Sequence, residues 1–159
     1  MTAYVRSASE RDLPAIAALL ERTWHDTYDT IYGAEEVSRL HAEWHALTAL
    51  KHQLDAPQSE FIVADDGAEI VGMGFARMVD DRTAQVAQLY VDPIAQRQGN
   101  GSELLTELMN AFPAARMIVV EVVSKNADAL TFYERFGFAE TSRRNEGDYE
   151  MLTLVRELA

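Results

Sequence analysis

The order of β-rich and helical segments changes once along this chain, and that change restricts the fold more than any other feature. Three β-rich runs, Phe61 to Ala64, Glu69 to Met78 and Ala84 to Val91, follow one another across short turns and predict an antiparallel meander. A helical segment, a β-branched strand and a second helical segment come next. Because a helix separates the two strands, this order favours a parallel pair. The later segments are Gly101 to Phe112, Met117 to Val123 and Ala127 to Phe136.

The segments on either side complete the expected order of elements. Ala3 to Ser7 predicts a first strand, and Ser9 followed by Asp12 resembles a capping box that begins a helix. A second helix is predicted over Ala34 to Leu54, with an aromatic connector, Trp24 to Gly33, between the two. At the other end of the chain, a closing hairpin is predicted from Phe138 to Arg143 and from Tyr149 to Val155.

Length and composition indicate one globular domain. The 159 residues, 48% of them hydrophobic, predict a single domain over residues 1–159 with its own core. The absence of cysteine excludes disulfides, a thiolate zinc site and a cysteine nucleophile, and no metal is predicted. No apolar run approaches the roughly 18 residues that span a bilayer, and the first residues lack the pattern of a signal peptide. We therefore expect a cytoplasmic protein without a membrane partner.

The acidic charge limits the choice of partners. A net charge of -12 argues against nucleic acid, because phosphate binding needs a basic face. Residues 1–80 carry 14 acidic and 6 basic side chains, and residues 81–159 carry 12 and 8. If the second half binds an anionic coenzyme, this gradient favours a cationic acceptor such as an amine. A solvated acidic surface explains the gradient equally well.

A glycine-containing segment at the start of a helix is the clearest candidate binding site. The third meander strand leads through Asp92-Pro93 into Gln96-Arg97-Gln98-Gly99-Asn100-Gly101. Glycines lack a Cβ atom, so several backbone N–H groups can point at one anion at a helix N-terminus. A pyrophosphate fits that description. Arg97 is the only cationic side chain from Ala84 through Gly101, so backbone amides, more than charge, are expected to hold the anion.

A second segment, Asn126 to Phe138, begins about 25 residues after Gly101 at the end of a predicted strand. In order and spacing, the two segments resemble the two signature motifs of the GCN5-related N-acetyltransferase (GNAT) family, and the resemblance covers nearly the whole chain. It implies the GNAT fold: an α+β (α/β three-layer) domain with a mixed, mostly antiparallel sheet of about seven strands and four helices. It also implies an acetyl-CoA-dependent N-acetyltransferase. Such an enzyme transfers acetyl to a primary amine of a small cationic molecule or peptide, by direct attack in a ternary complex.

The resemblance assigns roles to individual residues. Gln96 to Ser102 match the pyrophosphate loop, and the strand through Leu89 and Val91 matches the one whose main chain pairs with the pantetheine arm. Asn126 lies beside that arm, and Tyr133 matches the general acid that protonates the departing thiolate, although a core tyrosine is the alternative reading. The residues expected to contact the coenzyme are Leu89, Tyr90, Val91, Gln96, Arg97, Gln98, Gly99, Asn100, Gly101, Ser102, Asn126 and Tyr133. Those expected to contact the acceptor are Trp24, His25, Tyr28 and Glu121.

The general base departs from the family pattern. Many family members place a glutamate on the strand that corresponds to Gln85 to Val91, whereas the polar residues here are Gln85 and Gln88, which cannot accept the proton. Glu121, His25, Asp26 or a water chain could substitute. The two glutamines also motivate an alternative function, an acetyl-CoA-binding sensor or interaction module with little catalysis. Family members are often dimers, and an edge at residues 149–158 could pair two copies.

Two weaker patterns are set aside. Gly99 and Gly101, with Glu121 twenty residues later, resemble a dinucleotide-binding fingerprint, but position 104 is leucine and the strand ends too far from Gly99. His41 and His45 lie four residues apart on a predicted helix, but the intervening glutamate is in the wrong place for a zinc protease.

Overall fold

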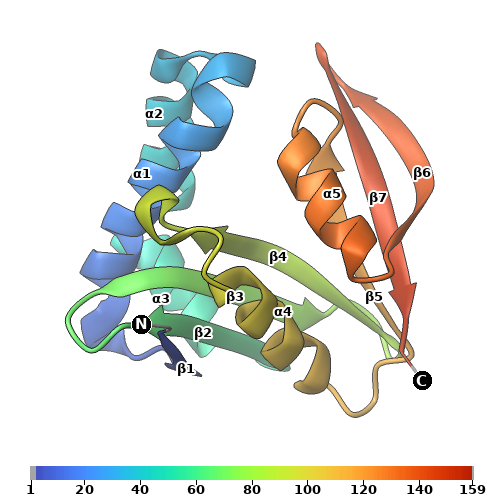
Figure 1. Cartoon of the computed structure of the whole chain (residues 1–159), viewed down its shortest axis with the longest axis horizontal. Helices are drawn as coiled ribbons and strands as arrows, with labels where there is room; N and C mark the ends of the chain where they lie inside the picture. The colour runs from blue at the N-terminus through green and yellow to red at the C-terminus, as the bar shows by residue number, and fades with distance from the viewer. Residues whose placement is uncertain (1–2, 159) are drawn as a thin grey trace.

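The structure, a computed structural model, describes residues 3–158, so the outermost residues of the predicted domain lie outside the described part. A seven-stranded sheet runs through the molecule and carries helices on both faces (Figure 1). Its strand order is β1-β2-β3-β4-β5-β7-β6, and every neighbouring pair is antiparallel except β4 and β5. The mixed, mostly antiparallel sheet is therefore confirmed. The strands are β1 (Tyr4–Ser7), β2 (Ser59–Asp65), β3 (Ile70–Met78), β4 (Thr83–Val91), β5 (Met117–Val123), β6 (Ala139–Glu146) and β7 (Tyr149–Glu157).

The described residues form five α-helices where four were expected. The helix predicted over residues 34–54 is divided at His45 and Ala46, because Ala46 has extended backbone angles and the buried His45 packs on Trp24 with ring centroids 5.0 Å apart. No glycine or proline marks this break, so a tertiary contact overrides local propensity. The aromatic connector expected at residues 24–33 was also wrong, since the first helix continues through it to Tyr32, with Gly33 as its C-cap. The helices are α1 (Leu13–Tyr32), α2 (Ala34–Trp44), α3 (Leu47–Asp55), α4 (Asn100–Asn110) and α5 (Ala127–Arg135), with short 3-10 turns η1 (Glu10–Asp12) and η2 (Pro93–Ala95).

Alternation along the strands places one hydrophobic core on each face of the sheet. On one face, leucines of α4 pack with Ile118 and Val120 of β5, and the core continues to Tyr133 of α5. On the other face, the apolar stripe of α1 packs on β2 and β3. Helix α4 approaches β3 closely at Gly74, where an added Cβ would lie 3.0 Å from Leu108. The sheet therefore separates the core beneath α4 and α5 from the core beneath α1.

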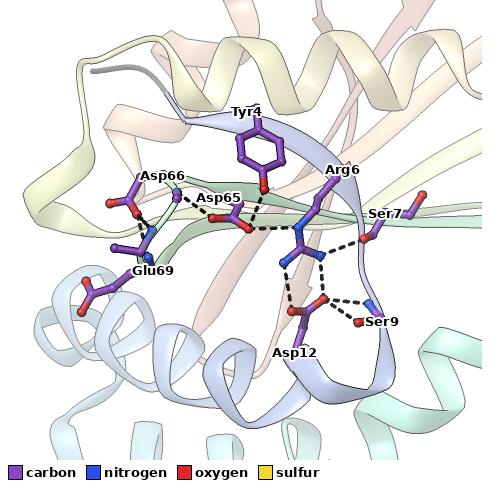
Figure 2. A network of polar contacts seen from close by, with 10 residues as sticks. Tyr4, Arg6, Ser7, Ser9, Asp12, Asp65, Asp66 and Glu69 are labelled. Atoms are coloured by element: carbon purple, nitrogen blue, oxygen red, sulfur yellow. Dashed lines mark hydrogen bonds and ion pairs between the residues drawn. The ribbon is translucent and has the colours of Figure 1, made fainter.

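A polar network fixes the N-terminal strand to the first helix (Figure 2). The guanidinium of Arg6 donates to both carboxylate oxygens of Asp12, at 2.8 and 3.0 Å, and to Asp65 at 3.0 Å. Asp12 also accepts from the backbone N–H of Ser9 at 2.8 Å, which confirms the predicted capping box. The hydrogen bonds from Arg6, aided by those from Ser9, hold the pKa of the Asp12 carboxyl well below its usual range. The network joins β1, the start of α1 and the end of β2.

Candidate active site

Strands β4 and β5 pair over four residues and then separate. Thr83 to Val86 lies in parallel register with Met117 to Val120, whereas β4 continues to Val91 and β5 to Val123. A β-bulge leaves Ala87 without a partner on β3 at the point where the pairing with β5 ends. Bulges increase the local twist and re-aim a strand. Among the described residues, backbone groups of residues 88–90 on the β5 side therefore have no strand partner and are free to pair with another extended chain.

The predicted pyrophosphate loop follows β4 and ends at the N-terminus of α4. Gly99 has a left-handed conformation with φ 85° and is the residue before the first helical turn, while Arg97 also has a positive φ of 65°. The backbone N–H groups at the start of a helix have no partner within it, so the geometry suits an anion. Asn100 is buried rather than exposed, and its side-chain amide donates to the carbonyl of Ala95 at 3.2 Å. This hydrogen bond therefore connects the first residue of α4 to the last residue of η2 across the loop.

An ion pair joins this loop to α1. Nε and Nη2 of Arg22 both donate to Oδ2 of Asp92, at 3.0 and 2.8 Å, and the other Asp92 oxygen accepts from the N–H of Ile94 at 3.2 Å. Asp92 is buried and is the residue that leads from β4 into η2. The sequence prediction missed this pair, because 70 residues separate its members. The Asp-Pro dipeptide, a frequent turn starter, was the one available signal.

Helix α5 supplies Asn126 and Tyr133. Asn126 is the N-cap of the helix, and its side-chain oxygen accepts from the N–H of Ala129 at 3.3 Å. Tyr133 is buried between Phe132 and Phe138, whose ring centroids lie 5.2 and 5.3 Å away. Burial raises the pKa of the Tyr133 hydroxyl well above its usual value, so the group is protonated at neutral pH. Tyr133 is thus part of the core and has the protonation state that the acid role requires.

Three tyrosines from different elements come together near the separated strands. Burial raises the pKa of Tyr28 on α1, an effect that the side chains of Tyr90 and Asn126 partly oppose. Tyr28 in turn raises the pKa of Tyr90 and of Tyr133, with burial the larger cause in both. Trp24, one turn before Tyr28, lies 4.7 Å from it between ring centroids and 6.3 Å from Tyr90. Ring contacts of Trp24 therefore join Tyr28 of α1 to Tyr90 of β4.

Other predicted residues are engaged elsewhere. His25 lies between α1 and α2, where Nδ1 contacts Asp29 at 2.6 Å and Nε2 contacts Ser38 at 3.3 Å. Glu121 on β5 forms an ion pair with Arg144 on β6. These partners engage two of the three side chains that were expected to replace the missing glutamate, and the third, Asp26, is exposed on α1.

The glutamines and histidines do not add a base or a metal site. The Gln88 side-chain oxygen accepts from Gln53 of α3 at 2.7 Å. His41 and His45 contact each other through their Nδ1 atoms at 2.8 Å, and burial, with the neighbouring His41, lowers the pKa of His45 to about 4. Within residues 3–158, no group of three or more His, Cys, Asp or Glu side chains is arranged to hold a metal ion. No helix in the same range is long and apolar enough to cross a membrane.

The fold and the arrangement of the loop, strand and tyrosine define a class of protein. The family profile described as acetyltransferase (GNAT) domain matches residues 28–153, so the chain belongs to the GNAT acetyltransferase family. Membership confirms the family and the enzyme class that the two sequence motifs indicated. By sequence, no curated protein matches the chain significantly.

Solved structures of similar fold agree with this assignment. PaiA N-acetyltransferase from Thermoplasma acidophilum, in complex with coenzyme A, superimposes with a TM-score of 0.87 at 20% identity, over 96% of this chain and 98% of that one. The ribosomal-protein-S18-alanine N-acetyltransferase from Escherichia coli gives a TM-score of 0.76 at 20% identity, over 99% and 94%. The yncA protein of Salmonella typhimurium, with its cofactor acetyl-CoA, gives 0.69 at 19% identity, over 98% and 94%. At these identities the similarity establishes the fold alone.

Proposed function

We propose that residues 1–159 form one catalytic domain that transfers the acetyl group of acetyl-CoA to a primary amine of a small cationic molecule or peptide. The observation that carries this proposal is the separation of β4 from β5 beyond Val86 and Val120. The N-terminus of α4 follows the end of β4, and Tyr133 of α5 is buried in the core. Family membership supports it, as do similar structures that contain coenzyme A or acetyl-CoA.

The coenzyme would lie along the separated part of β4. Its pyrophosphate would accept hydrogen bonds from the backbone of residues 96–102, where Gly99 supplies the left-handed turn and Arg97 a single positive charge. Its pantetheine arm would pair with the backbone of Leu89 to Val91, with Asn126 on the opposite side. Backbone N–H groups aimed along the arm would also stabilise charge on the thioester oxygen.

The reaction needs little more than alignment and one proton donor. The lone pair of the neutral amine attacks the thioester carbon, and the carbon–sulfur bond of the resulting tetrahedral species breaks. The departing thiolate takes the proton of the Tyr133 hydroxyl, and solvent then returns a proton to Tyr133. The nitrogen loses one proton to give the amide. Holding the amine and thioester together accounts for a large part of the acceleration.

We further propose that the amine proton passes to water rather than to a side chain. An alkyl ammonium with a pKa near 10.4 is only about one part in two thousand neutral at pH 7, so a route for this proton is required. Gln85 and Gln88 cannot accept it, Glu121 and His25 have partners of their own, and Asp26 is exposed to solvent on α1. Leu89 and Val91 are partly exposed, so water can reach this part of β4.

The test is thiol release from acetyl-CoA in the presence of a panel of primary amines, together with coenzyme binding by calorimetry. Turnover that depends on the amine, and a product carrying one acetyl group by mass, are the expected results. Saturable coenzyme binding without turnover of any amine would instead support the sensor or interaction module that Gln85 and Gln88 also fit. Absence of both would reject the site.

A further inference from the structure

Five aromatic side chains form a continuous series of ring contacts from β4 to β7. Centroid distances are 6.3 Å from Tyr90 to Trp24, 4.7 Å from Trp24 to Tyr28, 5.5 Å from Tyr28 to Tyr32, and 4.3 Å from Tyr32 to Tyr149. Aromatic pairs interact out to centroid distances of about 7 Å. We refer to Trp24, Tyr28, Tyr32, Tyr90 and Tyr149 as the aromatic arch.

The arch spans the place where the sheet divides. Tyr90 lies on the part of β4 beyond the bulge. On the other side, Met151 of β7 pairs with Val123, and the N–H of Ser124 donates to the carbonyl of Glu150 at 2.8 Å. Tyr149, two residues before Met151, is therefore placed beyond the separated end of β5. Tyr90 and Tyr149, the two ends of the arch, thus lie on opposite sides of the space between the separated strands β4 and β5.

The arch covers one face of this division only. Trp24, Tyr28, Tyr32 and Tyr90 belong to the core between the sheet and α1, whereas α4 and the pyrophosphate loop lie on the other face. Figure 1 shows α1 and α2 on one side of the upper part of the molecule and the β6–β7 hairpin on the other, with α5 between them. A coenzyme bound at the loop would leave the arch face for the acceptor.

The contact between Tyr32 and Tyr149 closes the arch. It is edge to face, with an interplanar angle of 78°, and among the described residues it is the aromatic pair that joins α1 to β7. Burial raises the pKa of Tyr32 to about 12, with Tyr28, Tyr149 and Glu146 as further causes. Neither tyrosine is fully buried, so the contact can separate without exposing the core.

We propose that the Tyr32–Tyr149 pair sets the width of the acceptor that reaches the thioester. Because the pair closes the arch, an acceptor has to part the two rings, and an amine at the end of an unbranched alkyl chain parts them less than one that is branched beside the amine-bearing carbon. Tyrosine ring faces also attract an alkyl ammonium within about 6 Å. The acceptor class is therefore a slender aliphatic primary amine. This inference rests on the proposed function.

The test compares n-pentylamine with neopentylamine, which have the same number of carbon atoms and differ in width. Tyr149→Ala should raise the ratio of kcat/KM for neopentylamine to kcat/KM for n-pentylamine about tenfold, equivalent to about 1.4 kcal/mol. Tyr32→Ala should change the ratio in the same direction. The double variant should change it no further, because both single substitutions remove one contact. Tyr149→Phe keeps the ring and should keep the wild-type ratio.

Tyr4→Ala is the matched control, since Tyr4 is an exposed tyrosine on β1, outside the arch. Thermal unfolding of each variant checks that the fold is retained, and the Tyr32 variants replace Tyr149→Ala if that chain does not fold. An unchanged ratio in folded variants that turn over both amines would overturn the inference and leave the proposed function intact. Loss of selectivity in the Tyr4 control would also overturn it. Turnover of no amine by the wild-type enzyme would overturn the proposed function itself.

Discussion

Arg22 and Asp92 connect α1 to the end of β4, directly before the loop that we propose binds the pyrophosphate. Two nitrogens of the Arg22 guanidinium donate to one oxygen of Asp92, and the second oxygen of Asp92 caps the turn before the loop. Trp24 of the arch lies two residues after Arg22 on the same helix. A displacement of α1 would therefore be transmitted to the loop, and loop ordering by the coenzyme would in turn fix α1.

Substitution of Arg22 should weaken coenzyme binding. In Arg22→Ala, we expect KM for acetyl-CoA to rise about tenfold and kcat to fall less than about threefold, because a charge-assisted hydrogen bond contributes roughly 1.5–3 kcal/mol and Arg22 is half exposed. Steady-state kinetics with acetyl-CoA as the varied substrate measures both constants. Arg11→Ala removes an exposed arginine in η1, directly before α1, and serves as the control. A change confined to kcat would contradict the role given to Arg22.

Removal of the Tyr133 hydroxyl should slow the chemical step. Tyr133→Phe should lower kcat by about 10²- to 10³-fold, within the usual range for a general acid, while the Kd for coenzyme A changes little because the ring stays packed against Phe138. Single-turnover kinetics and calorimetry separate the two effects. Phe132→Leu alters the packing next to Tyr133 without removing a proton donor and is the matched control. Full activity in Tyr133→Phe would assign protonation of the thiolate to another group.

A side chain at Gly99 should disturb the pyrophosphate loop. Gly99→Glu should weaken coenzyme binding by at least about tenfold, because it places a negative charge beside the anion and strains a residue with φ 85°. Gly67→Glu is a close control, since Gly67 has φ 95° in the turn between β2 and β3, and a Cβ at either glycine meets no atom within 4 Å. Calorimetric titration with coenzyme A compares the two. Equal loss in both variants would indicate a general effect of strain rather than a local effect on the site.

The Arg6–Asp12 network should make stability depend on pH in the acid range. Asp12→Asn is expected to lower the free energy of unfolding by about 1.5–3 kcal/mol at pH 7. The Asp12 pKa is lower in the folded than in the unfolded chain, so the unfolded chain binds more protons below about pH 4. The stabilisation is complete above that pH and is lost as the pH falls through the folded-state pKa.

Urea unfolding from pH 7 down to pH 2 measures this dependence. The wild-type curve should fall more steeply below about pH 4 than the curve of Asp12→Asn. Asp81→Asn changes an exposed aspartate in a turn and should leave both the stability and its pH dependence unaltered. Parallel curves for the wild type and Asp12→Asn would show that the ion pair contributes nothing through this titration.

Local patterns in the sequence were sufficient for most of the sheet and for the loop. The three β-rich runs became β2, β3 and β4, and the change to alternating strand and helix correctly predicted the parallel pair of β4 and β5. Glycines before a helix are a local signal too, and Gly99 is the residue directly before α4, where it has a left-handed conformation. The same applies to Ser9 and Asp12, whose capping box needs only three residues of separation.

What the sequence could not predict depends on contacts between distant residues. The break between α2 and α3 follows from the packing of His45 on Trp24, and the helical extension through Tyr32 overrides a segment that looked like a connector. The same limitation applies to Tyr149, which the strand pattern assigned to the closing hairpin. Only the folded chain places it against Tyr32. Periodicity identifies the faces of helices and strands, but not which faces meet.

The short pairing of β4 with β5 has a mechanical consequence. The sheet has two parts, one with β1 to β4 and the other with β5 to β7. Only the four residue pairs between β4 and β5 connect these parts within the described sheet, so the two parts can move relative to each other. A molecule that binds between the separated ends of β4 and β5, and contacts both strands, would limit this movement. Amide hydrogen exchange in the β6–β7 hairpin should then slow when the coenzyme binds, even though that hairpin lies far from the pyrophosphate loop along the chain.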